Sequence, residues 1–172
     1  MHSLYTLWKA FFDICRLRIA PQNLPISSVL LGLTLLFYTF ISMTLSLTQL
    51  SLKDAMLSSI VDTSLLVVLP SSLLYIAHYP ARIPQTLTAI AGTNCILGIL
   101  TFPLVFWLKF YDGQMTFLAL LLLLSLIGWG VLVYAHILRH ALNISFFLAV
   151  MLTMFMNLLT FNVLAQIVPF AK

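Results

Sequence analysis

The chain has very few charged residues and no glutamate at all. Only 7% of its 172 residues are charged, and the acidic side chains are four aspartates: Asp13, Asp54, Asp62 and Asp112. A soluble domain carries about 25% charged residues, so the composition excludes an ordinary soluble protein. Acid–base catalysis and hard-cation binding depend mostly on carboxylates, so their scarcity predicts a protein that is not an enzyme and needs no cofactor.

Cysteine is also scarce, and its two positions argue against a disulfide. Cys15 and Cys95 fall in different predicted segments and at different depths, and neither has a metal-type partner at close spacing. The net charge of +4 comes mostly from residues beside apolar segments. That distribution predicts no nucleic-acid partner, because a charge bias next to membrane spans explains it.

Long apolar runs dominate what is present, and 62% of the residues are hydrophobic. A helix needs about 20 apolar residues to cross the hydrocarbon. Five stretches qualify, near residues 26–47, 55–77, 85–108, 115–135 and 144–168. The connectors, such as "HYPARIP" and "HILRHALN", are too short to hold a soluble domain. The fold class predicted is an all-α polytopic membrane protein, with residues 21–172 forming a five-span transmembrane bundle.

The basic residues predict the orientation of this bundle. With the N-terminus inside and the C-terminus outside, the inner side holds five basic residues and the outer side three. The inner set is Lys9, Arg16, Arg18, Arg82 and Arg139, and the outer set is Lys53, Lys109 and Lys172.

The first 20 residues form a different kind of segment, predicted to be an interfacial amphipathic helix. Thr6, Lys9, Asp13 and Arg16 recur at helical spacing as one polar stripe, while Trp8 and other apolar residues cover the rest. Such a helix lies among lipid headgroups, with Lys9, Arg16 and Arg18 near anionic lipid. It either rests passively on the membrane or docks a partner. Pro21 and Pro25 end it before the first span.

Two histidines four residues apart, His136 and His140, raise the question of a metal or haem site. The spacing puts both on one helix face, but no glutamate lies between them and Arg139 repels a cation. His78 is the only obvious third ligand, and a haem held by His78 and His136 is the alternative. The favoured interpretation is polar residues at the inner interface that titrate near neutral pH.

The same region carries a resemblance to a known family. "LLYIAHYPAR" (73–82) and "VLVYAHILRH" (131–140) share a Tyr, an Ala-His pair and an Arg, which convergence on interface anchors explains better than duplication. Five spans, the short lead-in and "GWGVLVYAHILRHALNISFFLAV" resemble the Yip (Ypt-interacting protein) family and its bacterial relatives. The resemblance implies a non-catalytic protein of the bacterial inner membrane that binds partners or lipids. Trp129, His136 and Arg139 are the residues that correspond to the family's turn.

Asp62 is the most informative residue within a span, because burying a carboxylate in lipid costs several kcal/mol unless it is paired, protonated or hydrated. Ser58 and Ser59 lie one turn outward and predict a local polar notch. Lys109, at the outer end of the third span, is the expected counter-ion. A hydrogen-bonded packing contact is favoured here over an ion or proton site.

Three further polar residues, Tyr38, Asn94 and Asn157, fall near the middle of their spans. Thr153, Asn157 and Thr160 form a stripe on the last helix, and the face of Asn94 that includes Gly98 suits close helix packing. Interhelical contacts are favoured over a polar substrate path. Pro70 and Pro103 predict kinks in the second and third spans.

Three functions remain open. The first is a non-enzymatic accessory subunit or Yip-like membrane organiser that acts through helix–helix and lipid contacts, with other membrane proteins or further copies of itself as partners. The second is a small channel or transporter with Asp62 in the path. The third, an enzyme or cofactor subunit, ranks last because no nucleophile–base pair, phosphate loop or carboxylate pair is present.

Overall fold

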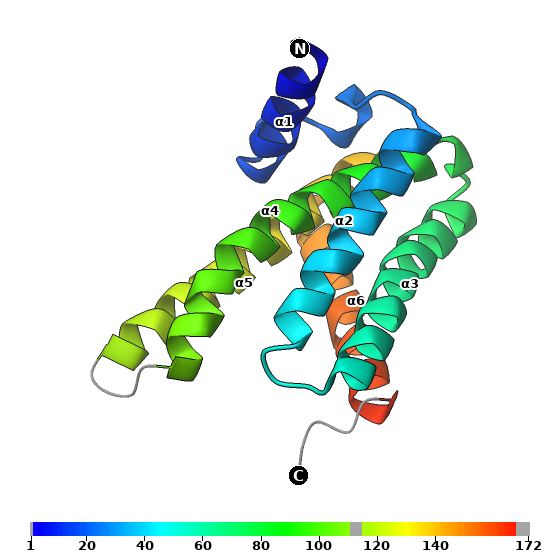
Figure 1. The fold of residues 1–172 in the computed structure, drawn as a ribbon. Helices are drawn as coiled ribbons and strands as arrows, with labels where there is room; N and C mark the ends of the chain where they lie inside the picture. Colours follow the sequence, from blue (N-terminus) through cyan, green and yellow to red (C-terminus); the bar gives the residue numbers. More distant parts are fainter. Residues whose placement is uncertain (1, 111–114, 168–172) are drawn as a thin grey trace.

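The computed structural model describes residues 2–110 and 115–167 of the chain, and side chains within residues 7–110 and 116–167. Every regular element among these residues is helical. The order is α1 (His2–Cys15), η1 (Pro21–Asn23), α2 (Ser28–Ser46), α3 (Leu52–Ile76), η2 (Pro80–Arg82), α4 (Ile83–Phe110), α5 (Met115–Leu142) and α6 (Phe146–Ile167) (Figure 1). The predictions that involve Thr6, Asp112 and Lys172 fall outside the described side chains.

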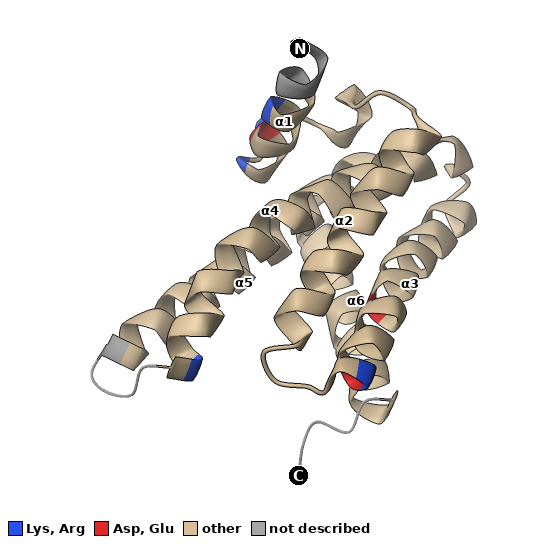
Figure 2. Ribbon diagram, in the orientation of Figure 1, with Lys and Arg blue, Asp and Glu red and all other residues tan. Residues whose placement is uncertain are grey.

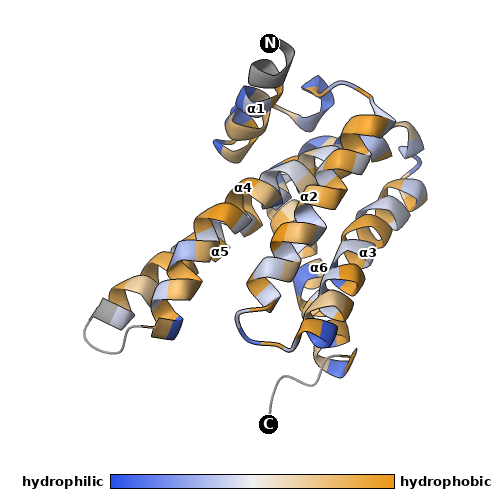
Figure 3. Cartoon of the chain, in the orientation of Figure 1, coloured by the Kyte–Doolittle hydropathy of each residue, from blue (hydrophilic) through white to orange (hydrophobic). Residues whose placement is uncertain are grey.

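The five predicted spans are confirmed as helices. Helices α2 to α6 are each long and apolar enough to cross a membrane. Apolar residues predominate along them (Figure 3), whereas the visible basic residues lie on α1 and at the far ends of the bundle (Figure 2). The composition therefore matches a bundle surrounded by lipid.

The fourth span is longer than predicted, and the segment 136–143 was wrongly assigned to a connector. Helix α5 continues to Leu142 and includes His136, Arg139 and His140. The apolar count stops at the first polar residues, whereas the backbone hydrogen bonding continues for two further turns. The turn between α5 and α6 is correspondingly short.

Serine side chains fix where α2 and α3 begin. Ser27 Oγ accepts from the backbone N–H of Leu30 at 3.3 Å. Ser51 Oγ accepts from the N–H of Asp54 at 3.4 Å and donates to the Asp54 carboxylate at 2.7 Å. These caps satisfy N–H groups that a helix start leaves unpaired. They explain why α3 begins before the apolar stretch does.

Three helices end with a residue in the left-handed region: Leu17 (φ 59°), His78 (φ 63°) and Asn143 (φ 56°). After each one, the next N–H reaches back to a carbonyl of the last helical turn, as in Tyr79 N to Leu74 O at 2.8 Å. This is the Schellman arrangement, which satisfies the carbonyls of a helix end. The backbone of His78 therefore serves as the stop of α3, and its side chain is exposed.

Helix α4 is the centre of the bundle, because it packs against α1, α2, α3 and α5. Its first half carries a continuous buried run from Thr86 to Thr93. Two glycines allow close neighbours. A Cβ at Gly92 would lie 2.3 Å from the Phe11 ring of α1, and a Cβ at Gly98 would lie 2.6 Å from Ile41 Cγ2 of α2. The small-residue face predicted around Gly98 is thus a helix–helix contact.

Helices α3 and α4 remain helical through Pro70 and Pro103. Near the α1 end, α5 and α6 pack tightly through the buried residues Leu138, Ala141 and Ala149. Away from that end, α4 and α5 together lean away from α3 and α6 (Figure 1), whereas α4 stays in contact with α2. The bundle is therefore closed at the α1 end and spread at the opposite end.

Candidate functional site

Helix α1 docks on the bundle through one face and exposes the other. Phe11, Ile14 and Cys15 are buried, with Phe11 seated over Gly92. Trp8 and Phe12 are 58% and 48% exposed. The apolar residues of this helix, which the sequence assigned to one continuous lipid-facing surface, therefore divide between the protein core and the surroundings.

The segment after α1, residues 16–27, crosses the closed end of the bundle; we refer to it as the N-terminal strap. Side chains of the bundle hold its backbone at several points. His136 Nε2 lies 3.3 Å from the Ile19 carbonyl, and Gln85 Nε2 donates to the Leu24 carbonyl at 2.8 Å. Just before the strap, Trp129 Nε1 donates to the Cys15 carbonyl at 3.0 Å. These bonds satisfy carbonyls that irregular backbone leaves without helical partners.

Arg82 and Gln22 complete this closed end by binding the C-terminal carbonyls of α5. Arg82 Nη1 donates to the Ala141 carbonyl at 2.9 Å and to the His140 carbonyl at 3.3 Å. Gln22 Nε2 from the strap donates to the same His140 carbonyl at 2.8 Å. A guanidinium at a helix C-terminus also opposes the negative end of the helix dipole. The Arg82 guanidinium lies 4.6 Å from the centre of the Tyr79 ring.

The polar residues predicted to lie at the inner interface therefore have mainly structural contacts. The rings of His136 and His140 meet edge to face at a centroid distance of 4.6 Å. His136 and Trp129 both contact the chain between Cys15 and Ile19, whereas Arg139 is exposed. Among the described residues, no three His, Cys or acidic side chains come together as a metal site. Cys15 and Cys95 are both free thiols.

Burial changes the chemistry of one group outside the spans. Cys15 is 6% exposed, and this burial raises the pKa of its thiol to about 11. Desolvation disfavours the thiolate, so Cys15 is a poor nucleophile in the docked helix.

Asp62 joins α3 to α2 by two hydrogen bonds to a single oxygen. Tyr38 Oη donates to Asp62 Oδ2 at 2.6 Å, and Ser42 Oγ donates to the same atom at 3.0 Å. At the next residue of each helix, the Thr39 and Thr63 hydroxyls pair at 2.8 Å across the same two helices. These bonds fit the favoured prediction that Asp62 makes a hydrogen-bonded packing contact. They involve only one of its two carboxyl oxygens.

The cation expected beside Asp62 was wrongly assigned. The Lys109 ammonium donates to the Thr48 carbonyl at the spread end of the bundle, where its side chain is exposed. Two serines one turn outward from Asp62 were predicted to form a local polar notch with it. Ser58 and Ser59 are buried, and Ser59 Oγ donates to the carbonyl of Met56 within its own helix.

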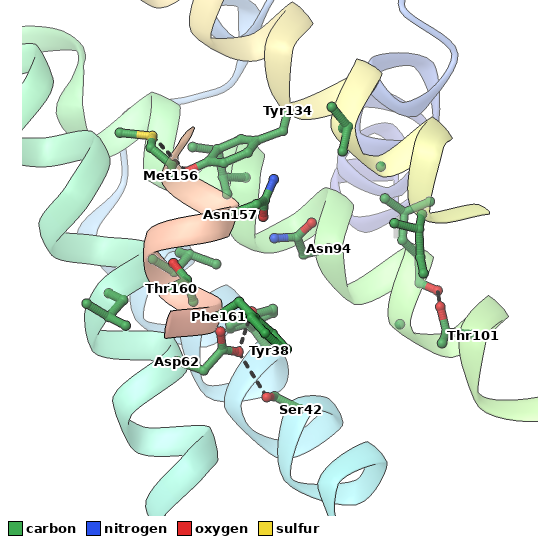
Figure 4. A pocket seen from close by; sticks show the side chains of 18 of the residues that line it. Tyr38, Ser42, Asp62, Asn94, Thr101, Tyr134, Met156, Asn157, Thr160 and Phe161 are labelled. Atoms are coloured by element: carbon green, nitrogen blue, oxygen red, sulfur yellow. Dashed lines mark hydrogen bonds between the residues drawn. The ribbon is translucent and has the colours of Figure 1, made fainter. Parts of the chain in front are cut away.

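A pocket of about 730 Å³ lies where α4 and α5 lean away from α3 and α6. Residues of α2 through α6 line it, and its polar side chains include Asp62, Tyr38, Asn94, Asn157 and Thr160. Figure 4 shows Asn94 and Asn157 pointing into this space, with Asp62 and Tyr38 below them. We call it the midplane pocket. The three mid-span residues predicted from sequence thus share one cavity with Asp62.

Helix geometry explains the depth of this cluster. Tyr38 and Asp62 each lie ten residues from the start of their helices, and Asn94 and Asn157 each lie eleven. At about 1.5 Å per residue, each is about 15 Å along its helix, close to half of a hydrocarbon thickness of about 30 Å.

The rim of the midplane pocket is apolar and exposed. Ile127 of α5 and Met154 and Leu158 of α6 line the pocket, yet 55%, 50% and 62% of their surfaces are exposed. The packing between α5 and α6 runs from their connecting turn to Tyr134 and Met156, and Ile127 and Leu158 lie beyond it. The pocket therefore opens sideways between α5 and α6, toward the surroundings of the bundle.

No family model, curated protein or solved structure matches this chain. The assignment of function therefore rests on the residues and their geometry.

The sequence patterns did not point to several residues of the midplane pocket and of the closed end of the bundle. Ser42 lies four residues after Tyr38, so the same helix face contains both, and this spacing was a usable signal. Tyr134 also lines the pocket and donates to Met156 Sδ at 3.8 Å. Gln22 and Gln85 gave no such signal, because single polar residues near proline-rich turns have no spacing that predicts a contact.

Proposed function

We propose that this chain is a non-enzymatic integral membrane protein, an accessory subunit that receives a transmembrane segment of a partner in the midplane pocket. The observation that carries the proposal is the sideways opening between α5 and α6, with apolar residues at its rim and polar residues inside. Lipid is as apolar as leucine, so helices in membranes associate through packing and polar contacts. A pocket with this distribution offers both to an incoming helix.

We also propose in which membrane the chain lies and how it is oriented there. The bundle lies in a bacterial inner membrane with the α1 end inside, where the positive-inside bias places five of the basic residues. Trp8 and Phe12 on the exposed face of α1 enter the lipid interface, with Lys9, Arg16 and Arg18 exposed nearby. A Yip-like organising role is compatible with the same contacts. Trp129 and His136, from the segment that resembles the Yip turn, hold the end of α1 and the N-terminal strap.

Site-specific photo-crosslinking in native membranes tests the docking. A photoreactive phenylalanine analogue replaces Ile127 or Leu158 at the rim, and Phe37 serves as the control, since it is 63% exposed and does not line the midplane pocket. We expect a discrete adduct with one membrane protein from both rim positions. Mass spectrometry should locate its crosslinked peptide within a transmembrane segment of that protein.

The control position separates docking from chance contact. Phe37 should give only lipid adducts, because nothing in its surroundings selects a helix. Equal protein adducts from Phe37 and the rim positions, or lipid adducts alone at all three, would contradict the proposal.

A second candidate, a small channel or transporter, is favoured by one observation: Asp62 lines a cavity rather than facing only its neighbours. In that case purified chains in liposomes should carry a proton or ion flux that Asp62→Asn abolishes. The closed α1 end requires the N-terminal strap to move during transport. Flux equal to that of protein-free liposomes would exclude this candidate.

A further inference from the structure

We infer that the midplane pocket selects a transmembrane helix with a lysine or arginine at its mid-depth, and that Asp62 makes the selecting contact. This inference rests on the docking function proposed above, and it adds the chemistry of the partner.

The charge of the pocket lining is complementary to a basic side chain. Among the residues that the structure describes, Asp62 is the only charged side chain that lines the midplane pocket, and no lysine or arginine lines it. Lys109, the counter-ion expected from the sequence, is bound to the Thr48 carbonyl instead. An intramembrane carboxylate is costly unless it is paired, and an incoming ammonium or guanidinium pairs it.

The carboxyl group of Asp62 is held by one of its two oxygens. The Tyr38 and Ser42 hydroxyls both donate to Oδ2, so they fix the side chain while Oδ1 takes part in neither bond. Asn94 and Asn157 point into the same space (Figure 4) and bring two amide carbonyl oxygens that also accept hydrogen bonds. An ammonium has three donors and no acceptor, so a pocket whose lining offers several acceptors suits it.

The depth of the polar cluster favours a helix over a phospholipid as the occupant of the pocket. The polar cluster lies about 15 Å along its helices, near the bilayer centre. A phospholipid headgroup stays at the interface, whereas a side chain on a spanning helix can be held at the centre. The opening between α5 and α6 gives such a helix lateral access, and its apolar face then contacts Ile127, Met154 and Leu158.

Synthetic transmembrane peptides of known composition test the inference directly. The probe is a leucine- and alanine-rich helix of about 23 residues with one central lysine. Comparison peptides carry leucine at the centre, or lysine about two turns from the centre. Binding to the full-length chain in lipid nanodiscs is measured by energy transfer between labelled peptide and labelled protein.

We expect the central-lysine peptide to bind about tenfold more tightly than the central-leucine peptide, because polar interhelical contacts contribute about 1–2 kcal/mol with model peptides. Asp62→Asn should remove this preference, whereas Asp62→Glu should retain it. Asp54→Asn is the matched control, since Asp54 caps the start of α3 and does not line the pocket. Size-exclusion profiles of each variant confirm that it is folded.

Each outcome decides the matter. Preference for central lysine that depends on a carboxylate at position 62 supports the inference. Equal binding of the lysine and leucine peptides to the unaltered chain overturns it, as does a lysine preference that survives Asp62→Asn. The docking function fails separately, if the rim positions give no protein adduct. If an adduct forms but the crosslinked segment has no basic residue near its middle, docking stands and this inference falls.

Discussion

Substitution of Gly92 by alanine is expected to undock α1 from the bundle. The new Cβ would lie 2.3, 2.6 and 2.8 Å from three atoms of the Phe11 ring. The ring is buried and rigid, so it must leave its position, and α1 must shift with it. Overpacking of this kind costs about 1–3 kcal/mol. The free energy that favours docked α1 over undocked α1 therefore falls by about 1–3 kcal/mol.

The reactivity of Cys15 reports this loss. In a Cys95→Ser background, Cys15 is the only thiol of the chain. It is 6% exposed with a pKa of about 11, so an alkylating reagent reacts mainly with the rare undocked helix. Since about 1.4 kcal/mol is a factor of ten in population, a cost of about 1–3 kcal/mol raises the labelling rate by about fivefold to 150-fold.

The chain offers two matched controls for this substitution. A Cβ at Gly32 or Gly128 would have no neighbour within 4 Å. Gly32→Ala and Gly128→Ala should therefore leave Cys15 labelling within about twofold of the parent, since surface changes rarely exceed about 0.5 kcal/mol. If Gly92→Ala labels no faster than these controls, the docking of α1 through Phe11 is refuted.

Three further predictions follow from burial and packing. Cys15 labelling should rise about tenfold per pH unit from pH 7 to 10, because only the thiolate reacts and burial raises the thiol pKa to about 11; a plateau near pH 8.5 would contradict this. The docked state retains the protonated thiol, so docking should weaken between about pH 8.5 and 11. Asp62→Ala should lower the free energy of unfolding in detergent by about 1–3 kcal/mol, because it leaves two hydroxyls without their acceptor. Tyr38→Phe should lower it by only about 0.5–1.5 kcal/mol, because it removes a single hydrogen bond. Gly98→Ala should cost about 1–3 kcal/mol in the same assay, since its Cβ would meet Ile41 Cγ2 at 2.6 Å; an unchanged melting temperature would exclude that contact.

Sequence patterns were most reliable where they depend on local chemistry. The apolar runs located all five spans, because crossing hydrocarbon requires a length of apolar helix that any such run reveals. They were least reliable at the end of α5. Polar residues such as His136 and His140 end an apolar count without ending a helix. What ends α5 is the backbone geometry at Asn143, where φ is 56°.

The candidate site shows the same division. Asp62, Tyr38, Asn94 and Asn157 were each identified by depth, since polar residues within a span are costly and must face something. Their meeting in one pocket was not predictable from spacing, because they lie on four different helices. The role of Lys109 was wrongly predicted for the same reason. A distance along the chain does not give the direction in which an exposed side chain extends.

By itself, the amino-acid sequence determined that the chain has five helices able to cross a membrane, where these helices lie and which polar residues fall within them, because hydropathy and the 1.5 Å rise act within single helices. Only the tertiary structure decided that Phe11 seats over Gly92, that the closed end holds residues 16–27, and that α5 and α6 part around a polar pocket. Those features depend on the packing of one helix surface against another, which steric fit between distant residues sets and no local pattern encodes.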